Sequence, residues 1–366
     1  MKIIMVIPTL ELAGAEKMCE ALSIYLNKTN EVIVISLYNI RTSITDELKK
    51  YGIKVIFLNK KRGFDFSTII SLRKVLVVEK PDVIHTHLDS LKYVAFATVF
   101  LKVPVMIHTI HNIANKEASG ITQLLYKICF KYRNVIPVAL SPEIKSSISI
   151  YYGIKYKRIP MIFNGIDLDK CIKKQSYENK KIIFTHVGRF SLQKNHRLLI
   201  DAYKKISEEF HDTELWLIGD GELVEQIKTR VFKYNLENKV VFWGLRDDVL
   251  KLLNKSDVFV LPSKYEGVPI SIIEAMGTGL PVIATDTGGV KSMVKDNING
   301  LLINCDTNEL YIAMKKMKSK TIREKYGQAS VIIANKKFSV RGMAEAYLKL
   351  YNIGMKRYEN SSSGRI

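Results

Sequence analysis

The sequence predicts a two-domain α/β protein built on parallel sheets. A length of 366 residues is enough for two domains that each bury a core of their own. Short apolar runs rich in valine and isoleucine alternate along the chain with amphipathic helical segments, and this alternation is typical of parallel βαβ units. Glycine-containing turns follow several of these runs, where the carboxyl ends of parallel strands collect ligands.

The first half of the chain opens like a Rossmann-like domain. Residues 2–7 form an apolar run that stops at Pro8, and a loop containing Gly14 then leads into a helix that begins near Ala15. We expect further strands at residues 32–36, 54–58, 83–85, 105–109, 135–139 and 158–163.

The second half repeats the same pattern of strand, glycine turn and helix after a polar linker at residues 170–181. Strands are expected at residues 182–187, 215–218, 239–243, 258–261 and 282–284. The chain then becomes helical and rich in lysine. Its last long helix is expected at residues 340–355, followed by a frayed tail at 360–366.

Two acidic residues in the stretch 256–290 predict a ligand site. Glu266 lies in the loop after a buried strand, and Glu274 lies on the second turn of the helix that follows, so both carboxylates are expected in one crevice. Pro269 suits the first helical position. The amides of Ile270 and Ser271, together with the helix dipole, would attract an anion such as a diphosphate.

This stretch resembles the E-x7-E signature of retaining GT-B glycosyltransferases, most closely glycosyltransferase family four, also called group 1. The resemblance implies the GT-B fold, in which two Rossmann-like domains face each other across a cleft. It implies an acceptor-binding domain at residues 1–169, with a C-terminal helix at about 340–366 crossing back onto it. It also implies a nucleotide-sugar-binding domain at residues 170–339.

Other segments carry the same resemblance in the family's order. Gly188-Arg189 followed by Lys194-Asn195 is similar to the family's G-R…K-N motif, whose two cations would flank a diphosphate. The family usually shows two glycines before Ala-Glu, whereas this chain keeps only Gly14. Asn164 to Asp167 resembles the family's N-G-[IV]-D turn at the domain junction.

The resemblance also implies roles for single residues. His111, which follows a strand, matches the histidine beside the donor sugar, and Arg189 and Lys194 would neutralise the leaving diphosphate. His111, Glu266, Arg189 and Lys194 are therefore the expected catalytic residues. The expected nucleotide-sugar site comprises Gly14, Gly188, Arg189, Lys194, Gly244, Leu245, Arg246, Glu266, Gly267, Val268, Pro269, Ile270, Ser271 and Glu274.

The net charge of +20 indicates an anionic partner. Residues 115–133 read as a basic amphipathic helix that resembles a membrane-docking helix, with Lys127, Lys131 and Arg133 as tentative contacts to an anionic membrane surface. A helix that faces the core with a solvated basic side is the open alternative. No aromatic-basic interleaving or known reader motif indicates specific nucleic-acid binding.

The cysteines and the acidic residues indicate neither a disulfide framework nor a metal site. The four cysteines are far apart, which suits a reducing cytoplasm. Asp167 and Asp169 imitate a D-x-D metal motif, yet they follow a strand and a glycine and read as turn residues. We expect no metal and no cofactor other than the nucleotide sugar as co-substrate.

The sequence therefore predicts a retaining, metal-independent glycosyltransferase. It would use a nucleotide sugar as the donor, most commonly a UDP-sugar, and a saccharide on undecaprenyl diphosphate as the acceptor. The setting would be capsule, exopolysaccharide or O-antigen synthesis at the inner face of the cell membrane. Two alternatives stay open, namely a GT-B nucleotide-sugar isomerase of the 2-epimerase type and a non-catalytic basic binding protein. Acceptor-dependent release of the nucleotide separates the transferase from the isomerase.

Overall fold

The computed structural model describes residues 1–178 and 180–363 of the chain. These residues form two compact units. The first comprises Met1–Gly165 and the C-terminal segment that begins at Val340, and the second comprises Ile166–Ser339. The first unit is therefore formed by both the N-terminal and the C-terminal segments of the chain. The expected boundary between residues 169 and 170 lies close to this division.

The first unit contains a six-stranded parallel sheet in the order β3-β2-β1-β4-β5-β6. Its strands are β1 (Lys2–Ile7), β2 (Glu31–Ser36), β3 (Lys54–Phe57), β4 (Val83–His87), β5 (Val105–Ile110) and β6 (Val135–Ala139). Helices cover both faces of such a sheet, so its central strands are continuous apolar runs. The run Ile3 to Ile7 of β1 follows this rule and is fully buried.

Helices connect the strands of this unit, and several begin at a side-chain cap. They are α1 (Gly14–Leu26), α2 (Ser43–Lys50), α3 (Phe66–Glu79), α4 (Leu91–Ala97), α5 (Ala114–Glu117), α6 (Gly120–Tyr132) and α7 (Pro142–Tyr152). Thr42, Asp65 and Ser141 accept hydrogen bonds from the first amides of α2, α3 and α7. Such caps satisfy donors that a helix cannot satisfy itself.

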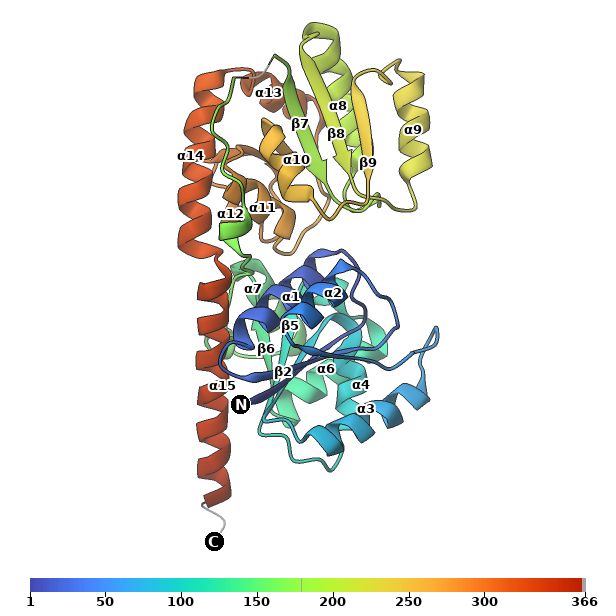
Figure 1. Cartoon of the computed structure of the whole chain (residues 1–366), viewed down its shortest axis with the longest axis vertical. Coiled ribbons are helices and arrows are strands. Elements are labelled where there is room, and N and C mark those ends of the chain that lie inside the picture. The colour runs from blue at the N-terminus through green and yellow to red at the C-terminus, as the bar shows by residue number, and fades with distance from the viewer. Residues whose placement is uncertain (179, 364–366) are drawn as a thin grey trace. The chain divides into compact units, whose positions relative to one another are not determined.

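The C-terminal helix α15 (Val340–Ser363) packs on α1 and β5 of the first unit (Figure 1). Ala344, Tyr347 and Tyr351 recur at helical spacing and are fully buried. Gly354 allows a close approach, because a Cβ atom there would lie 2.7 Å from a methyl group of Val105. The expected return of this helix to the first domain is confirmed.

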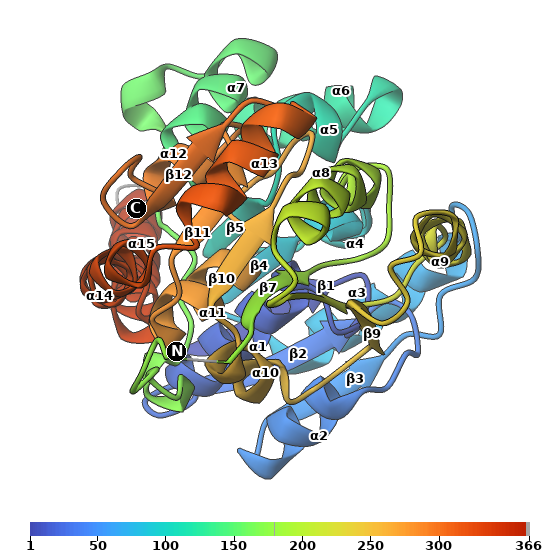
Figure 2. The same ribbon diagram turned by 90° about the horizontal axis from the view of Figure 1, so that it is seen from above.

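The second unit contains another six-stranded parallel sheet, in the order β12-β11-β10-β7-β8-β9. Its strands are β7 (Ile182–Val187), β8 (Thr213–Ile218), β9 (Val240–Gly244), β10 (Val258–Leu261), β11 (Val282–Thr285) and β12 (Gly300–Ile303). Figure 2 shows β12, β11, β10 and β7 side by side in this order. The strand order reverses between β7 and β10, and such a switch point is where open parallel sheets bind ligands.

Helices again alternate with the strands of the second unit. They are α8 (His196–Glu209), α9 (Val224–Lys233), α10 (Val249–Lys255), α11 (Ile270–Thr278), α12 (Val290–Met293), α13 (Thr307–Lys316) and α14 (Lys320–Lys337). The core of this unit includes Phe184, Leu215 and Val260, one from each of three strands, with Leu199 and Tyr203 of α8 packed against them. The two-domain α/β prediction is thus confirmed.

Four local expectations differ from the structure. Residues 158–163 form no strand beyond a single bridge from Met161 to Ala139, because Pro160 has no amide to donate to a ladder. The short strand β12 was not predicted. The helix expected within 115–133 is two helices, α5 and α6, with extended backbone at Ala118 between them. α15 continues to Ser363, so residues 360–363 are helical rather than frayed, and residues 364–366 lie outside the described residues.

Candidate functional site

The loop after β10 holds Glu266 in a buried position beside Lys194. The carboxylate of Glu266 is 6% exposed, and its Oε1 accepts a hydrogen bond from Nζ of Lys194 at 2.6 Å. Lys194 itself comes from the loop after β7. Since β7 and β10 are neighbours in the sheet, these loops meet at the strand-order switch. The structure therefore brings together two of the residues expected from sequence.

Two glycines fix the backbone of the Glu266 loop. Gly288 has a φ of 50°, and a Cβ atom there would lie 1.8 Å from the carbonyl oxygen of Glu266. The next residue, Gly289, donates its amide to the carbonyl oxygen of Gly267 at 3.0 Å. No side chain fits at position 288 without moving this loop. A glycine at position 288 is thus required by the position of the Glu266 loop.

Helix α11 follows this loop and begins one residue later than expected. Pro269 is the N-cap, with extended backbone, and Ile270 is the first helical residue. Because first-turn amides have no acceptor within the helix, those of Ile270 and Ser271 are available to an anion. Glu274 lies further along α11 and is 7% exposed.

The loop after β7 separates its two expected cations. Gly188 packs against Lys194, since a Cβ atom at 188 would lie 3.2 Å from the lysine side chain. The side chain of Arg189 is 72% exposed, and its Nε lies 3.4 Å from a carboxylate oxygen of Glu222. Lys194 is therefore placed beside Glu266, whereas Arg189 points to solvent and pairs with a different acid.

Gly244 ends β9, and Leu245 and Arg246 follow it in the turn. Gly244 has a φ of 66°, and its carbonyl oxygen accepts the amide of Gly219 at 2.8 Å. Leu245 is exposed. The guanidinium of Arg246 binds both carboxylate oxygens of Asp248, at 2.7 and 2.8 Å. This salt bridge fixes Arg246 along the turn, so backbone groups and Leu245 are what the turn offers to a ligand.

Gly14 in the first unit begins α1 beside a buried carboxyl group. Glu16, two residues later, is 5% exposed and accepts a hydrogen bond from the Thr9 hydroxyl at 3.0 Å. Burial raises the pKa of Glu16 to about 7. The group therefore titrates near neutral pH, next to the glycine that the sequence singled out.

His111 lies just beyond the end of β5 and is held at both its ring and its backbone. Nε2 of His111 is 3.1 Å from Nδ1 of His87, which ends β4. Glu117 accepts the backbone amides of His111 and Asn112 through one oxygen, at 3.1 and 2.9 Å. Burial lowers the pKa of His111 to about 3, so its ring is neutral.

Comparison with known proteins assigns both halves of the chain. Residues 12–170 match the model for Glycosyltransferase Family 4, and residues 169–330 match that for Glycosyl transferases group 1. A UDP-Gal:alpha-D-GlcNAc-diphosphoundecaprenol alpha-1,3-galactosyltransferase of Escherichia coli is 30% identical in an alignment of 293 residues, and the match covers 74% of each chain. The chain belongs to glycosyltransferase family four.

Other similar proteins extend the comparison over nearly the whole chain. One is a GalNAc-alpha-(1->4)-GalNAc-alpha-(1->3)-diNAcBac-PP-undecaprenol alpha-1,4-N-acetyl-D-galactosaminyltransferase of Campylobacter jejuni. It is 27% identical over 363 residues, 96% of this chain and 98% of that one. The crystal structure of Anabaena Alr3699/HepE with UDP and glucose matches with a TM-score of 0.84 and 20% identity, over 96% and 99% of the two chains. The expected GT-B fold is confirmed.

Two residues that support the glycosyltransferase's site were not predicted from its sequence. They are Glu16 and Glu117, whose side chains are buried. Burial raises the pKa of Glu117 to about 8. A weak signal for Glu117 was present, because an acid soon after a strand-end histidine suits the capping of backbone amides. The side-by-side placement of His87 and His111 depends on the pairing of β4 with β5, which sequence spacing alone does not give.

Helix α6 of the glycosyltransferase exposes an apolar stripe. Its most exposed apolar side chains are Ile121, Leu124, Ile128 and Tyr132. Lys127 and Lys131 are exposed beside this stripe. Arg133 instead donates its guanidinium to the carbonyl oxygen of Ala95 and the hydroxyl of Thr98. Arg133 thus joins α6 to α4, while the two lysines face solvent.

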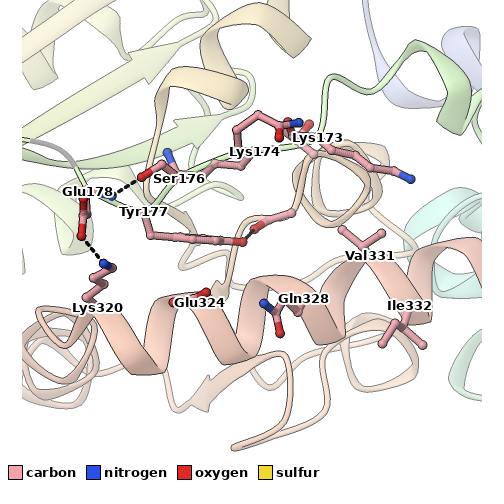
Figure 3. Close-up of a pocket in the computed structure, with 13 residues that line it drawn as sticks. Lys173, Lys174, Ser176, Tyr177, Glu178, Lys320, Glu324, Gln328, Val331 and Ile332 are labelled. Carbon is pink, nitrogen blue, oxygen red and sulfur yellow. Dashed lines mark hydrogen bonds and ion pairs between the residues drawn. The ribbon is translucent and has the colours of Figure 1, made fainter.

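The linker segment lines a separate pocket of about 530 Å³ in the second unit (Figure 3). Tyr177 donates its hydroxyl to the carbonyl oxygen of Gly279 at 2.6 Å. Lys174 reaches Asp257 at 3.2 Å, so both side chains fasten the linker to the unit. Glu178 pairs with Lys320 of α14 at the rim. This pocket contains none of the site residues predicted from sequence.

Within residues 1–178 and 180–363, no helix has the length and apolar character that a membrane span requires. Over the same residues, no group of three or more histidine, cysteine, aspartate or glutamate side chains is arranged to hold a metal ion.

Proposed function

We propose that this glycosyltransferase moves a sugar from a UDP-sugar to a saccharide carried on undecaprenyl diphosphate, with retention of configuration and without a metal ion. The observation that carries the proposal is the buried Lys194–Glu266 pair at the strand-order switch of the second unit. The names of the Escherichia coli and Campylobacter jejuni relatives support the acceptor class, because both name an undecaprenol carrier.

The donor diphosphate is assigned to the loops after β7 and β10. Lys194 supplies a largely buried cation there, and the first amides of α11 supply donors that are fixed before the reaction begins. Arg189 is exposed, and its contact with Glu222 is long enough to exchange for a phosphate oxygen. These groups stabilise the negative charge that develops on UDP as the glycosidic bond breaks. Glu274 is assigned to the ribose hydroxyls.

Retention is supported by product chemistry. The two relatives are named for α linkages, and nucleotide sugars of the common D-hexoses are themselves α-linked, so an α product keeps the configuration. We assign no enzymic nucleophile. The acceptor hydroxyl adds on the face that UDP leaves, and its proton passes to an oxygen of the departing diphosphate. Glu266 supports the sugar electrostatically, and His111 hydrogen-bonds to it.

Peripheral binding to an anionic membrane is the second part of the proposal. Ile121 and Leu124 of α6 are 88% and 59% exposed, and Phe100, in the loop after α4, is 98% exposed. α4 packs on α6, so that this loop and the apolar stripe belong to one side of the first unit. Apolar side chains beside Lys127 and Lys131 suit the headgroup region of anionic lipids, where the acceptor's carrier resides. We place the reaction at the cytoplasmic face of the membrane, in surface-polysaccharide assembly.

Product analysis tests the proposal. The purified enzyme is incubated with UDP-galactose, UDP-N-acetylgalactosamine or UDP-glucose, and with a polyprenyl-diphosphate saccharide in detergent micelles containing EDTA. The proposal predicts one productive UDP-sugar and an α-anomeric coupling in the proton NMR spectrum of the product. A β product would contradict retention. Consumption of the UDP-sugar to an epimer without acceptor would indicate the isomerase instead.

A further inference from the structure

His87 faces His111 from inside the sheet of the first unit. It is the last residue of β4, is fully buried, and pairs in register with Thr109 of β5. Its Nδ1 is 3.1 Å from Nε2 of His111, while its own Nε2 is buried without a hydrogen-bond partner. Within the described residues, His111 is therefore the only hydrogen-bond partner of the His87 ring.

Both rings are neutral. Burial and the neighbouring histidines lower the pKa of His87 well below its usual value, and burial lowers that of His111 to about 3. A neutral imidazole carries one N–H and one bare nitrogen. One of the two nitrogens, Nδ1 of His87 or Nε2 of His111, is consequently protonated and donates a hydrogen bond to the other. Which nitrogen carries this proton fixes the tautomer of both rings.

The unpaired Nε2 of His87 decides between the two arrangements. If Nε2 of His111 is protonated, Nδ1 of His87 is bare, and Nε2 of His87 carries a buried N–H without an acceptor. If Nδ1 of His87 is protonated, Nε2 of His87 is bare and is a buried acceptor without a donor. Orphaned buried N–H groups are rarer in native proteins than under-satisfied acceptors. This arrangement places the proton of His111 on its other nitrogen, Nδ1.

We propose that His87 is a positioning residue that holds His111 in the Nδ1–H tautomer, so that His111 donates a hydrogen bond to its ligand. Within the described residues no protein group bonds Nδ1 of His111, which leaves that N–H for an oxygen of the donor sugar. The identity of this ligand rests on the proposed function. The tautomer itself does not.

His87 is in turn supported by a hydrogen-bonded layer. The ring of His85 lies against it, with centroids 4.3 Å apart. His85 is fixed by the hydroxyls of Tyr351 and Thr109, both at 2.7 Å. Tyr351 belongs to α15, so the C-terminal helix backs the pair. A ring fixed in this way holds its partner at little entropic cost, as supporting residues around functional groups do.

Nitrogen NMR of the full-length, ligand-free enzyme tests the tautomer directly. The protein is labelled with ¹⁵N at its seven histidines, and His111 is assigned from a spectrum of His111→Gln. We expect a protonated Nδ1 and a bare Nε2 for His111. In His87→Leu, which removes the shared proton, we expect His111 to become a mixture of tautomers. His87→Asn keeps an amide N–H near the position of Nδ1 and should preserve the wild-type pattern.

Activity measured on the same variants separates positioning from simple structural support. Loss of one well-placed hydrogen bond predicts a fall in kcat of about tenfold for His87→Leu. KM for the UDP-sugar should be nearly unchanged, and His87→Asn should restore most of kcat. Equal melting temperatures for both variants would rule out general unfolding as the cause.

Three results would overturn the proposal. They are a protonated Nε2 on His111 in the wild type, an unchanged tautomer in His87→Leu, and equal losses of kcat in the leucine and asparagine variants. Failure of the proposed function is distinguishable from these. A wild-type enzyme without transferase activity on any donor would still give the tautomer spectrum, and that spectrum alone would then decide the role of His87.

Discussion

Nζ of Lys194 lies 2.6 Å from Oε1 of Glu266, and both side chains are largely buried. The two residues come from the loops after β7 and β10, the neighbouring strands at which the sheet order of the second unit reverses. Burial makes this pair costly to separate, because either charge alone would remain in a poorly solvated site. The pair therefore contributes to the stability of the second unit, and its lysine also supplies the positive charge that we assign to the donor diphosphate.

Single and double substitutions distinguish these two contributions. Lys194→Met and Glu266→Gln should each lower stability, by up to about 3–5 kcal/mol where the remaining charge stays fully buried. The double variant removes both charges and should regain much of the melting temperature, yet it should stay inactive because the diphosphate has lost its cation. Calorimetry and a UDP-release assay measure the two effects. Recovery of activity in the double variant would contradict the assignment.

Gly288→Ala should displace the Glu266 loop. The new Cβ atom would lie 1.8 Å from the carbonyl oxygen of Glu266, so the backbone must move. Gly52→Ala is the matched control, since Gly52 also has a positive φ but has no atom within 4 Å of the added Cβ. Both variants should lose about 1–2 kcal/mol of stability from the left-handed backbone. Only Gly288→Ala should lose transferase activity. Equal activities of the two variants would contradict the role of Gly288 in fixing the Glu266 loop.

Glu117 should make stability fall as pH rises. Its folded-state pKa of about 8 exceeds its usual 4.5, so the folded protein binds the proton more tightly than the unfolded chain. This stabilisation is fully present below about pH 4.5 and is lost as pH rises toward 8. Glu117→Gln still accepts the amides of His111 and Asn112, and it should flatten the slope of the free energy of unfolding.

Urea unfolding of both proteins at several pH values between 6 and 9 measures this difference. Buried histidines such as His108, whose pKa is lowered to about 3, act mainly below pH 6.5 and are shared by both proteins. The difference between wild type and Glu117→Gln therefore isolates the carboxyl group. An identical slope in both proteins would show that Glu117 is ionised throughout.

Phe100→Ser combined with Ile121→Ser should weaken binding to anionic vesicles. Both side chains are exposed on the first unit, where burying them in lipid would gain about 1.5–3 kcal/mol each. Phe232→Ser is the matched control, since Phe232 is 69% exposed but belongs to the second unit. Co-sedimentation with phosphatidylglycerol vesicles at low and physiological salt measures the effect. Undiminished binding of the double variant would exclude this surface.

The sequence predicted the architecture well because strand and helix patterns are local. The runs at β1, β7 and β10 are apolar enough to be recognised without the structure. Glu266 and Lys194 were predicted because each belongs to a compact motif of its own. Their direct contact was not predicted, since it depends on two loops 72 residues apart in sequence.

Other features escaped prediction for similar physical reasons. Arg189 belongs to the same motif as Lys194, but its direction is set by Glu222, which no motif includes. Arg133 was expected at a membrane, yet the backbone of α4 lies within its reach. No local pattern in the linear sequence predicts that Glu16 and Glu117 are buried. Their burial, which shifts the pKa of each toward neutrality, is a property of the folded unit.

Acceptor-dependent release of UDP is the most direct test of the proposed function. The wild-type enzyme and the Lys194→Met/Glu266→Gln double variant are each given the productive UDP-sugar, with and without a polyprenyl-diphosphate saccharide. We predict that the wild type releases UDP rapidly only when the acceptor is present, and that the double variant releases almost none. Equal release by the two proteins, or release that ignores the acceptor, would contradict a transferase that works through this pair.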